Sequence, residues 1–331
     1  MSYGNEIRRE FAVRLKAANR KNGRLEAVLI ILTQVGAVFI PAWASVVAFD
    51  ANIYLGCLAY VAAVLFIGTR YRALSNIIHE CTHFAFTSDR NWNNHIGRLL
   101  SIPMFYSFDA YREVHLSHHR HTGDYEKDLD FKGLKRFRFH EEIDRPTIIR
   151  HFLTSITLQH VPEYIGRTVF KRGEGLFFNA LRILYVSTFV FLPLTLGFQS
   201  YATWVLIGYI VVPYATALQM ISYWGDALDH GGLFHHDDEL LQTRNSIVKN
   251  PILRALLFPR NDCFHLVHHL FPHIPACELP RCHAELMKFD KYASLDHDLG
   301  GRTWQLWLAR EEDIRFNDAA SDGKRMSDAN E

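Results

Sequence analysis

The chain has 331 residues, and its 36 Lys and Arg nearly balance its 35 Asp and Glu, giving a formal net charge of +1. A nucleic-acid-binding protein needs a basic excess to neutralise phosphates, so this balance argues against that class. The five cysteines include no Cys-x-x-Cys pair, which argues against a disulfide framework and a thiolate zinc site. The mean hydropathy of -0.05 is that of a soluble enzyme, but the charges are unevenly distributed.

Three stretches contain no Asp, Glu, Lys or Arg: residues 27–49, 51–69 and 183–225. A helix crosses the hydrocarbon core of a bilayer with about 20 apolar residues, so each of the first two stretches provides one span. The third has 43 residues, enough for two spans, and Pro193 and Gly197 interrupt its middle. Helices of soluble proteins usually carry a polar stripe, which these stretches lack. We therefore expect an all-α integral membrane protein with four transmembrane helices in two hairpins, at about residues 27–49, 51–69, 183–198 and 202–224.

Lys and Arg residues cluster before the first span, after the second and before the third, whereas the turns around Asp50 and Gln199 contain none. The positive-inside rule then places both termini and all charged blocks in the cytoplasm. The chain divides into a cytoplasmic N-terminal segment (1–26), a single membrane domain (27–315) and a polar tail (316–331) that we expect to be disordered. The charged blocks would form a helical cap on the cytoplasmic side of the spans.

Residues 146–161, between the two hairpins, form an amphipathic segment. Pro146 is suited to the first turn of a helix, and Ile149, Phe152, Leu153 and Ile156 follow at helical intervals. We expect a helix that lies on the membrane surface.

Histidine is unusually frequent, with 19 residues, and eight of them fall in three short motifs. On a helix, positions i, i+3 and i+4 share one face, so each motif directs two or three imidazoles to one place. Chance readily produces one His-x-x-x-His in a chain of this composition, but not two copies of His-x-x-His-His. The motifs are His79-Glu-Cys-Thr-His83, His115-Leu-Ser-His118-His119 and His265-Leu-Val-His268-His269.

These histidines form a candidate metal site in the predicted cap. Neutral imidazole binds Fe, Zn, Cu or Ni, and eight clustered imidazoles exceed what one tetrahedral zinc ion uses, so the number favours two metal ions. His230, directly after the fourth span, is a ninth candidate ligand. Five further residues are expected to contact the ligands rather than to bind metal themselves: Asp226, His121, His273, Asp128 and Asp130.

The motifs in their extended forms, HECTHFAF, HLSHHRHTGD and FHLVHHLFPHIP, resemble those of the membrane fatty acid desaturase and hydroxylase superfamily. The resemblance covers about residues 51–283. It implies a non-haem centre of two iron ions, dioxygen as co-substrate, and two electrons from a separate carrier. Asp226 stands where some members carry an Asn that reaches iron through water. The resemblance assigns the iron ions to His79, His83, His115, His118, His119, His230, His265, His268 and His269.

The resemblance implies a desaturase that introduces a double bond into a fatty-acyl, lipid-like substrate within the membrane. A hydroxylase or another oxygenase of the superfamily, acting on a lipid or a specialised metabolite, is the alternative. The sequence contains no His-Pro-Gly-Gly haem-binding segment and no cysteine set for an iron–sulfur cluster. We therefore expect an external electron donor, namely a ferredoxin, a rubredoxin or a cytochrome b-type protein.

Two other functions use the same residues. His79 to His83 also reads His-Glu-x-x-His, the zinc-binding helix of metalloproteases, with Glu80 as general base. A membrane zinc protease would need only one further ligand and would leave most of the clustered histidines unexplained. A metal transporter would place ligands inside the spans, yet the uncharged stretches contain no histidine.

Overall fold

The computed structural model describes residues 2–15, 19–169 and 175–300, so the predicted disorder of the tail 316–331 concerns residues outside the described ranges. The described residues form helices and connecting loops, and their only β-pairing is an isolated bridge between Asn22 and Thr87. The predicted all-helical fold is therefore confirmed for this part of the chain.

Four helices are long and apolar enough to cross a membrane, as predicted: Arg24–Ala51, Ile53–Thr82, Leu176–Leu196 and Tyr201–His230. The first consists of α2 (Arg24–Gly36) and α3 (Phe39–Ala51), the second is α4 (Ile53–Thr82), and the third is α9 (Leu176–Leu196). The fourth joins α10 (Tyr201–Leu206), two π-helical turns, η3 (Ile207–Val211) and η4 (Tyr214–Leu218), and α11 (Gln219–His230).

The second and fourth helices extend well beyond the predicted spans 51–69 and 202–224. The predicted second span stops before Arg70, the first charged residue after the charge-free stretch. None of the residues that follow breaks a helix, so α4 continues to Thr82. The extensions carry His79 and His230 on the same rigid rods that form the apolar helices.

Local sequence signals set the ends and breaks of these helices. Asn52 has extended backbone, ends α3, and accepts hydrogen bonds from the backbone N–H groups of Tyr54 and Leu55, so it caps α4. Gly197, with φ of +76°, ends α9 in a conformation that favours glycine. Pro213 cannot donate the backbone hydrogen bond of an α-helix, and it lies between the two π-turns.

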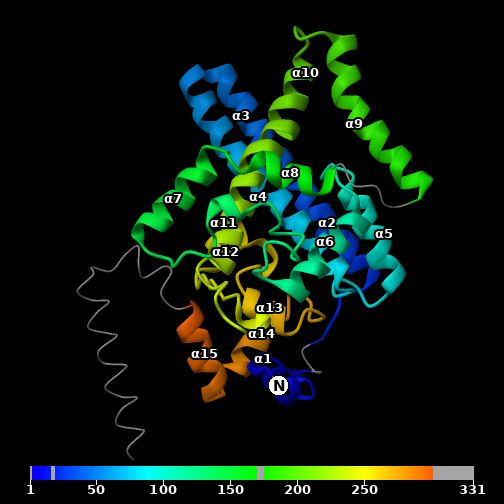
Figure 1. The fold of residues 1–331 in the computed structure, drawn as a ribbon. Helices are drawn as coiled ribbons and strands as arrows, with labels where there is room; N and C mark the ends of the chain where they lie inside the picture. The colour runs from blue at the N-terminus through cyan, green and yellow to red at the C-terminus, as the bar shows by residue number, and fades with distance from the viewer. Residues whose placement is uncertain (1, 16–18, 170–174, 301–331) are drawn as a thin grey trace, which may run out of the picture.

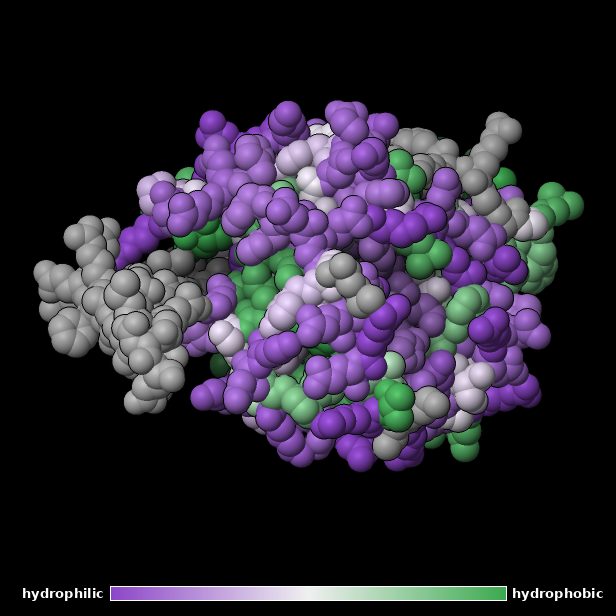
Figure 2. Space-filling view, turned by 60° about the horizontal axis from the view of Figure 1, so that its bottom comes forward, coloured by the Kyte–Doolittle hydropathy of each residue, from purple (hydrophilic) through white to green (hydrophobic). Residues whose placement is uncertain are grey.

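Figure 1 shows α3, α9 and α10 projecting from one end of the molecule, with α1, α13, α14 and α15 at the opposite end. Large apolar side chains of the projecting helices face outward, among them Ile40, Trp43, Leu184 and Phe191. The view in Figure 2, in which the α1 end comes forward, shows a mainly hydrophilic surface. The molecule therefore has an apolar end and a polar end, as a protein partly embedded in lipid requires.

The polar end is built from shorter helices. They are α1 (Tyr3–Phe11), α5 (Arg90–Ser101), α6 (Phe108–His121), α7 (Arg145–Ile156), α8 (Val161–Val169), α12 (Pro251–Leu257), α13 (His265–Leu270), α14 (Leu279–Leu286) and α15 (Asp290–Gly300). Three 3-10 turns connect them: η2 (Lys135–Phe137), η5 (Glu239–Leu241) and η6 (Pro259–Asn261).

The predicted segment 146–161 forms α7, which ends at Ile156, earlier than expected. Asp144 caps it by accepting a hydrogen bond from the backbone N–H of Thr147. Leu158, with φ of +58°, turns the chain before α8 begins. Ile149, Phe152 and Leu153 are exposed on α7, as a helix lying on a membrane surface requires.

A buried core beside the fourth long helix fixes α13. Leu266 and Val267 on α13 pack with Leu286 and Tyr292, and all four side chains are fully buried. Buried Arg244 donates hydrogen bonds to the backbone carbonyls of Leu228, Gly231 and Leu299, which ties the end of α11 to α15. Because a charge is buried only when it is well paired, these bonds define a single position for this segment.

The second and fourth helices approach each other closely at Gly68. A Cβ atom built at this position would lie 2.3 Å from the Cβ of Ala217 on η4. Small residues let helix backbones approach closely within a membrane. Tyr60 lies about two turns before Gly68 on α4, and its hydroxyl donates a hydrogen bond of 3.0 Å to the carbonyl of Gly208. This crossing sets the position of His79 relative to His230.

We expect Gly68→Ala to destabilise the protein by about 1–3 kcal/mol, because the added methyl group must push α4 away from η4. The thermal unfolding midpoint of the detergent-solubilised protein should fall, and the iron content per chain should fall with it. Gly36→Ala is the matched control, since a Cβ there meets nothing within 4 Å. Equal midpoints for the two variants would contradict the role assigned to this crossing.

Candidate metal centre

Four elements bring the predicted ligands together. His79 lies one turn before the end of α4, and His83 is the residue that ends it. α6 carries His115, His118 and His119 in its last turns, and α11 ends at His230. The short helix α13 begins at His265 and carries the rest of the third motif.

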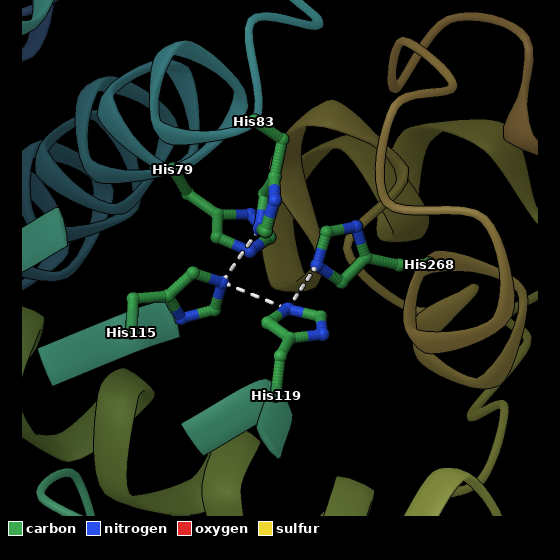
Figure 3. Close-up of side chains that lie close together, drawn as sticks. All are labelled: His79, His83, His115, His119 and His268. Carbon is green, nitrogen blue, oxygen red and sulfur yellow. Dashed lines mark hydrogen bonds between the residues drawn. The ribbon is translucent and has the colours of Figure 1, made fainter. Parts of the chain in front are cut away.

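The nine histidines form two groups. Within each group, one potential ligand atom per residue lies within 4.8 Å of every other. The first group contains His79, His83, His115, His119 and His268, and the second contains His118, His230, His265 and His269. Figure 3 shows the five rings of the first group pointing toward a common centre from three segments of the chain.

Helix geometry explains how each His-x-x-His-His motif serves both groups. Successive residues turn by about 100°, so positions i and i+4 are about 40° apart on the helix, whereas i+3 is about 60° away on the other side. Accordingly His115 and His119 enter the first group and His118 the second. On α13 the assignment is reversed, because His265 and His269 enter the second group and His268 the first.

The spacing of the ring nitrogens suits metal coordination. In the first group, Nε2 of His115 lies 2.9 Å from Nε2 of His83, and Nε2 of His119 lies 3.0 Å from Nε2 of both His115 and His268. In the second, Nε2 of His230 lies 3.1 Å from Nε2 of His265. Two imidazole nitrogens that bind one ion at a right angle, each about 2.1 Å away, are about 3.0 Å apart.

The ring nitrogens have few other partners. Nε2 of His79, Nδ1 of His119 and both ring nitrogens of His269 are buried without a hydrogen bond to the described residues. Buried polar atoms without partners cost free energy, and native proteins rarely tolerate several in one place. A bound metal cation would interact with the lone pairs of ring nitrogens in this cluster, for which the described residues supply no hydrogen-bond donor. The residues therefore fit a metal centre.

Burial keeps the imidazoles neutral. It lowers the pKa of His115, His119 and His268 far below the usual range, and the neighbouring histidines lower it further. Burial, followed by the charge of Arg112, lowers the pKa of His83 to about 3. A neutral imidazole has a lone pair for a metal, so at neutral pH these residues are ready to act as ligands.

His118 differs from the others because it has a carboxylate partner. Burial lowers its pKa, but the charge of Asp128 and a hydrogen bond of 2.9 Å from His118 Nδ1 to Asp128 Oδ2 outweigh this, so the pKa is raised. Asp128 is fully buried, and its Oδ1 accepts hydrogen bonds from the backbone N–H groups of Asp130 and Phe131. With Nδ1 as donor, Nε2 of His118 presents its lone pair to the second group.

Similar contacts orient two other rings. His230 Nδ1 donates a hydrogen bond of 2.9 Å to the carbonyl of Gln242. His265 Nδ1 lies 3.6 Å from Oδ2 of buried Asp229. Sequence analysis did not identify Gln242 or Asp229, since neither has a spacing relation to the residue that it contacts.

The remaining predicted neighbours lie further out. The Asp226 carboxylate accepts a hydrogen bond from Tyr164, and both Asp226 and Asp130 line a cavity beside the histidine groups. His273 is exposed, and its partial desolvation, then the charges of Lys21 and Arg8, lower its pKa. His121 is the last residue of α6, and its carbonyl accepts a hydrogen bond from the backbone of Asp124. None of these four belongs to either histidine group.

Glu80 has a structural role that does not suit a protease base. Arg260 donates to both of its carboxylate oxygens, at 2.8 and 3.0 Å, and the backbone N–H of Ala276 donates to Oε2. This buried ion pair joins α4 to the segment that precedes α13. A general base needs an oxygen directed at the metal-bound water, and here both oxygens are occupied by other donors. The metalloprotease hypothesis is therefore disfavoured.

Comparison with known proteins agrees with this site. A family model described as fatty acid desaturase matches residues 55–298, a range that contains all nine histidines. The chain belongs to the fatty acid desaturase family. The resemblance stated from the histidine motifs is thus confirmed.

Three of its relatives match more than 60% of the chain at 23–28% identity. Dihydrorhizobitoxine desaturase of Bradyrhizobium elkanii is 28% identical over 80% of this chain and 79% of its own length. The sn-1 acyl-lipid omega-3 desaturase (ferredoxin) of Synechocystis is 23% identical over 65% of this chain and 63% of its own. A chloroplastic omega-3 fatty acid desaturase of Brassica napus is 25% identical over 63% of this chain and 56% of its own.

We expect Asp128→Asn to weaken iron binding by about 10- to 100-fold, because the amide no longer holds His118 by a charged hydrogen bond. Competition with an iron chelator measures this affinity. Asp124→Asn, in the same loop, is the control, since Asp124 caps a local turn and joins neither histidine group. Unchanged iron affinity in Asp128→Asn would refute the orienting role.

Proposed function

We propose that this protein is an oxygen-dependent desaturase in which nine histidines hold two iron ions. The observation that carries the proposal is the division of nine buried or partly buried imidazoles into two groups at ligand spacing, the first of which is drawn in Figure 3. The ligands would be His79, His83, His115, His119 and His268 for one ion and His118, His230, His265 and His269 for the other. When bound, the iron pair would supply the chemistry that activates dioxygen and removes hydrogen from an unactivated C–H bond.

The protein's own residues would position and shield this chemistry. Burial of the histidines excludes bulk water from the centre, and Asp128, Gln242 and Asp229 fix ring orientations. Formation of one double bond takes two hydrogens from the substrate, and reduction of one dioxygen to two waters consumes these together with two electrons and two protons. An external carrier would deliver the electrons, and a relative whose name specifies ferredoxin supports this class of donor.

The sequence predicts a fatty-acyl substrate, and several relatives have names that specify acyl lipids. The Bradyrhizobium elkanii relative, which matches 80% of this chain, is named for dihydrorhizobitoxine instead, so family membership leaves the substrate class open. The product separates desaturation from the alternative hydroxylation, because a desaturated product has lost two hydrogens and a hydroxylated one has gained an oxygen.

We further propose that both termini and the metal centre face the cytoplasm. Support comes from the Lys and Arg residues that flank the four helices on the polar side and from the absence of Lys and Arg in the turns around Asp50 and Gln199.

Alanine at His83, His118 or His268 is expected to abolish oxygen-dependent product formation, because each change removes a ligand that no neighbour replaces. Mass spectrometry of lipid and water-soluble extracts from cells with and without the gene gives the product, and metal analysis gives the iron content. His297→Ala is the control, since this exposed side chain on α15 lies outside both groups. Turnover in any ligand variant, or one zinc and no iron per wild-type chain, would refute the proposal.

A reporter that is active only outside the cytoplasm tests the orientation. We expect activity when it is fused after Asp50 or Gln199, and no activity when it is fused after Lys127, in the polar end. The reverse pattern would contradict the proposed topology while leaving the chemistry of the centre untouched.

A further inference from the structure

A cavity of about 130 Å³ lies beside the histidine groups, enclosed by residues of α4, α6, α8, η4 and α11. Three residues of its wall are one helical turn before a histidine of the centre. Ser75 precedes His79 on α4, Tyr111 precedes His115 on α6, and Asp226 precedes His230 on α11. The Tyr111 ring also stacks on the His115 ring, at 5.8 Å between centroids and 3° between planes. A molecule in this cavity therefore lies one helical turn from the proposed iron centre and contacts Tyr111, whose ring stacks on His115.

The wall of the cavity is polar. Four tyrosines line it, together with the charged residues Arg72, Asp130 and Asp226. The Tyr106 hydroxyl is buried there and makes no hydrogen bond within the described part of the chain. An alkyl chain in this place would remove water from the polar groups and return no hydrogen bonds, which is costly for each group.

Aromatic side chains close the cavity toward the apolar helices. Tyr214 lines it and donates a hydrogen bond of 2.9 Å to the carbonyl of Met104. Behind Tyr214, Phe105 packs at 4.8 Å between ring centroids and contacts Tyr185 and Phe189 of α9. The volume also falls below the about 300–1,000 Å³ typical of sites for drug-sized ligands.

The charges of the wall indicate what a small ligand carries. Arg72 directs Nε and Nη2 to Asp262, and its Nη1 makes no hydrogen bond to the described residues. A guanidinium N–H group of this kind is a donor for a carboxylate. The carboxylates of Asp226 and Asp130 stand in the same wall and can accept hydrogen bonds from an ammonium group. A cavity with charges of both signs suits a ligand with charges of both signs.

We propose that the substrate is a small zwitterionic, amino-acid-like molecule whose side chain is desaturated, rather than the fatty-acyl chain that the sequence predicts. The inference rests on the proposed function, since it takes the histidine groups as the reacting centre. The ligand's charged end would bind the polar wall, and its aliphatic part would extend toward Tyr111 and the metal ligands.

Binding can be tested without turnover. Iron-loaded protein in lipid nanodiscs is titrated with L-norleucine and a panel of the common amino acids, and with hexanoate, hexylamine and palmitate, each of which carries only one of the two charges of the zwitterion. A ligand of the folded state raises the thermal unfolding midpoint. We expect at least one amino acid to raise it and the three singly charged compounds to leave it unchanged.

Two variants locate the binding. Ser222→Leu fills the cavity and should abolish the shift, whereas Thr188→Leu, an exposed position on α9, should retain it. Tyr106→Phe removes one donor from the wall and should weaken binding about tenfold without unfolding the protein.

Stabilisation by palmitate alone, stabilisation by no amino acid, or an amino-acid shift that persists in Ser222→Leu would overturn the inference. Failure of the proposed function would look different. It would show as absent iron or as absent oxygen-dependent product, and neither result depends on which compound raises the midpoint.

Discussion

The structure depends on one constraint: nine buried or partly buried imidazoles lie together, and several of their nitrogens have no partner among the described residues. Burying a polar atom without a hydrogen bond is unfavourable, so such a cluster is stable only if something else satisfies it. A metal ion can be that partner. Burial keeps imidazoles such as His115 and His268 unprotonated, so each has a ring-nitrogen lone pair that can bind the ion. A metal ion bound to this cluster would therefore also stabilise the fold, and the rest of the fold holds four separate segments at ligand distance.

Each segment is held by a different kind of contact. α4 approaches η4 at Gly68 within the apolar end, and the Glu80–Arg260 pair joins α4 to the chain that precedes α13. Arg244 binds the end of α11 through backbone carbonyls, and α13 is held by its own apolar core. A buried ion pair adds little net stability but is costly to break, so contacts of this type specify position more than they raise stability. The ligands need that specificity, since shifts of about 0.5 Å disturb a metal site.

The sequence was sufficient for the features that depend on local pattern. Charge-free stretches predicted the four apolar helices, and the spacing within each motif predicted which histidines share a helix face. Contacts between distant segments carried no such signal. Asp229 meets His265, and Arg260 meets Glu80 across 180 positions, through tertiary packing alone. The predicted spans say where a helix leaves lipid, whereas caps and breaks mark where the helix stops, so the charge-free stretches did not define the helix ends. The structure continues α4 beyond the predicted span to His79 and Thr82.

The cavity shows why the same histidine framework does not define a substrate. The ligands lie on α4, α6, α11 and α13, while the wall beside them is formed by residues one turn earlier on three of these helices and by α8 and η4. Wall positions can change without moving a ligand, because a side chain one turn away shares the helix but not the coordination. Here those positions hold Ser75, Tyr111 and Asp226, which favour hydrogen bonding over apolar contact. The histidines would therefore determine the chemistry of the reaction. The wall residues one helical turn before them would determine which class of molecule is oxidised.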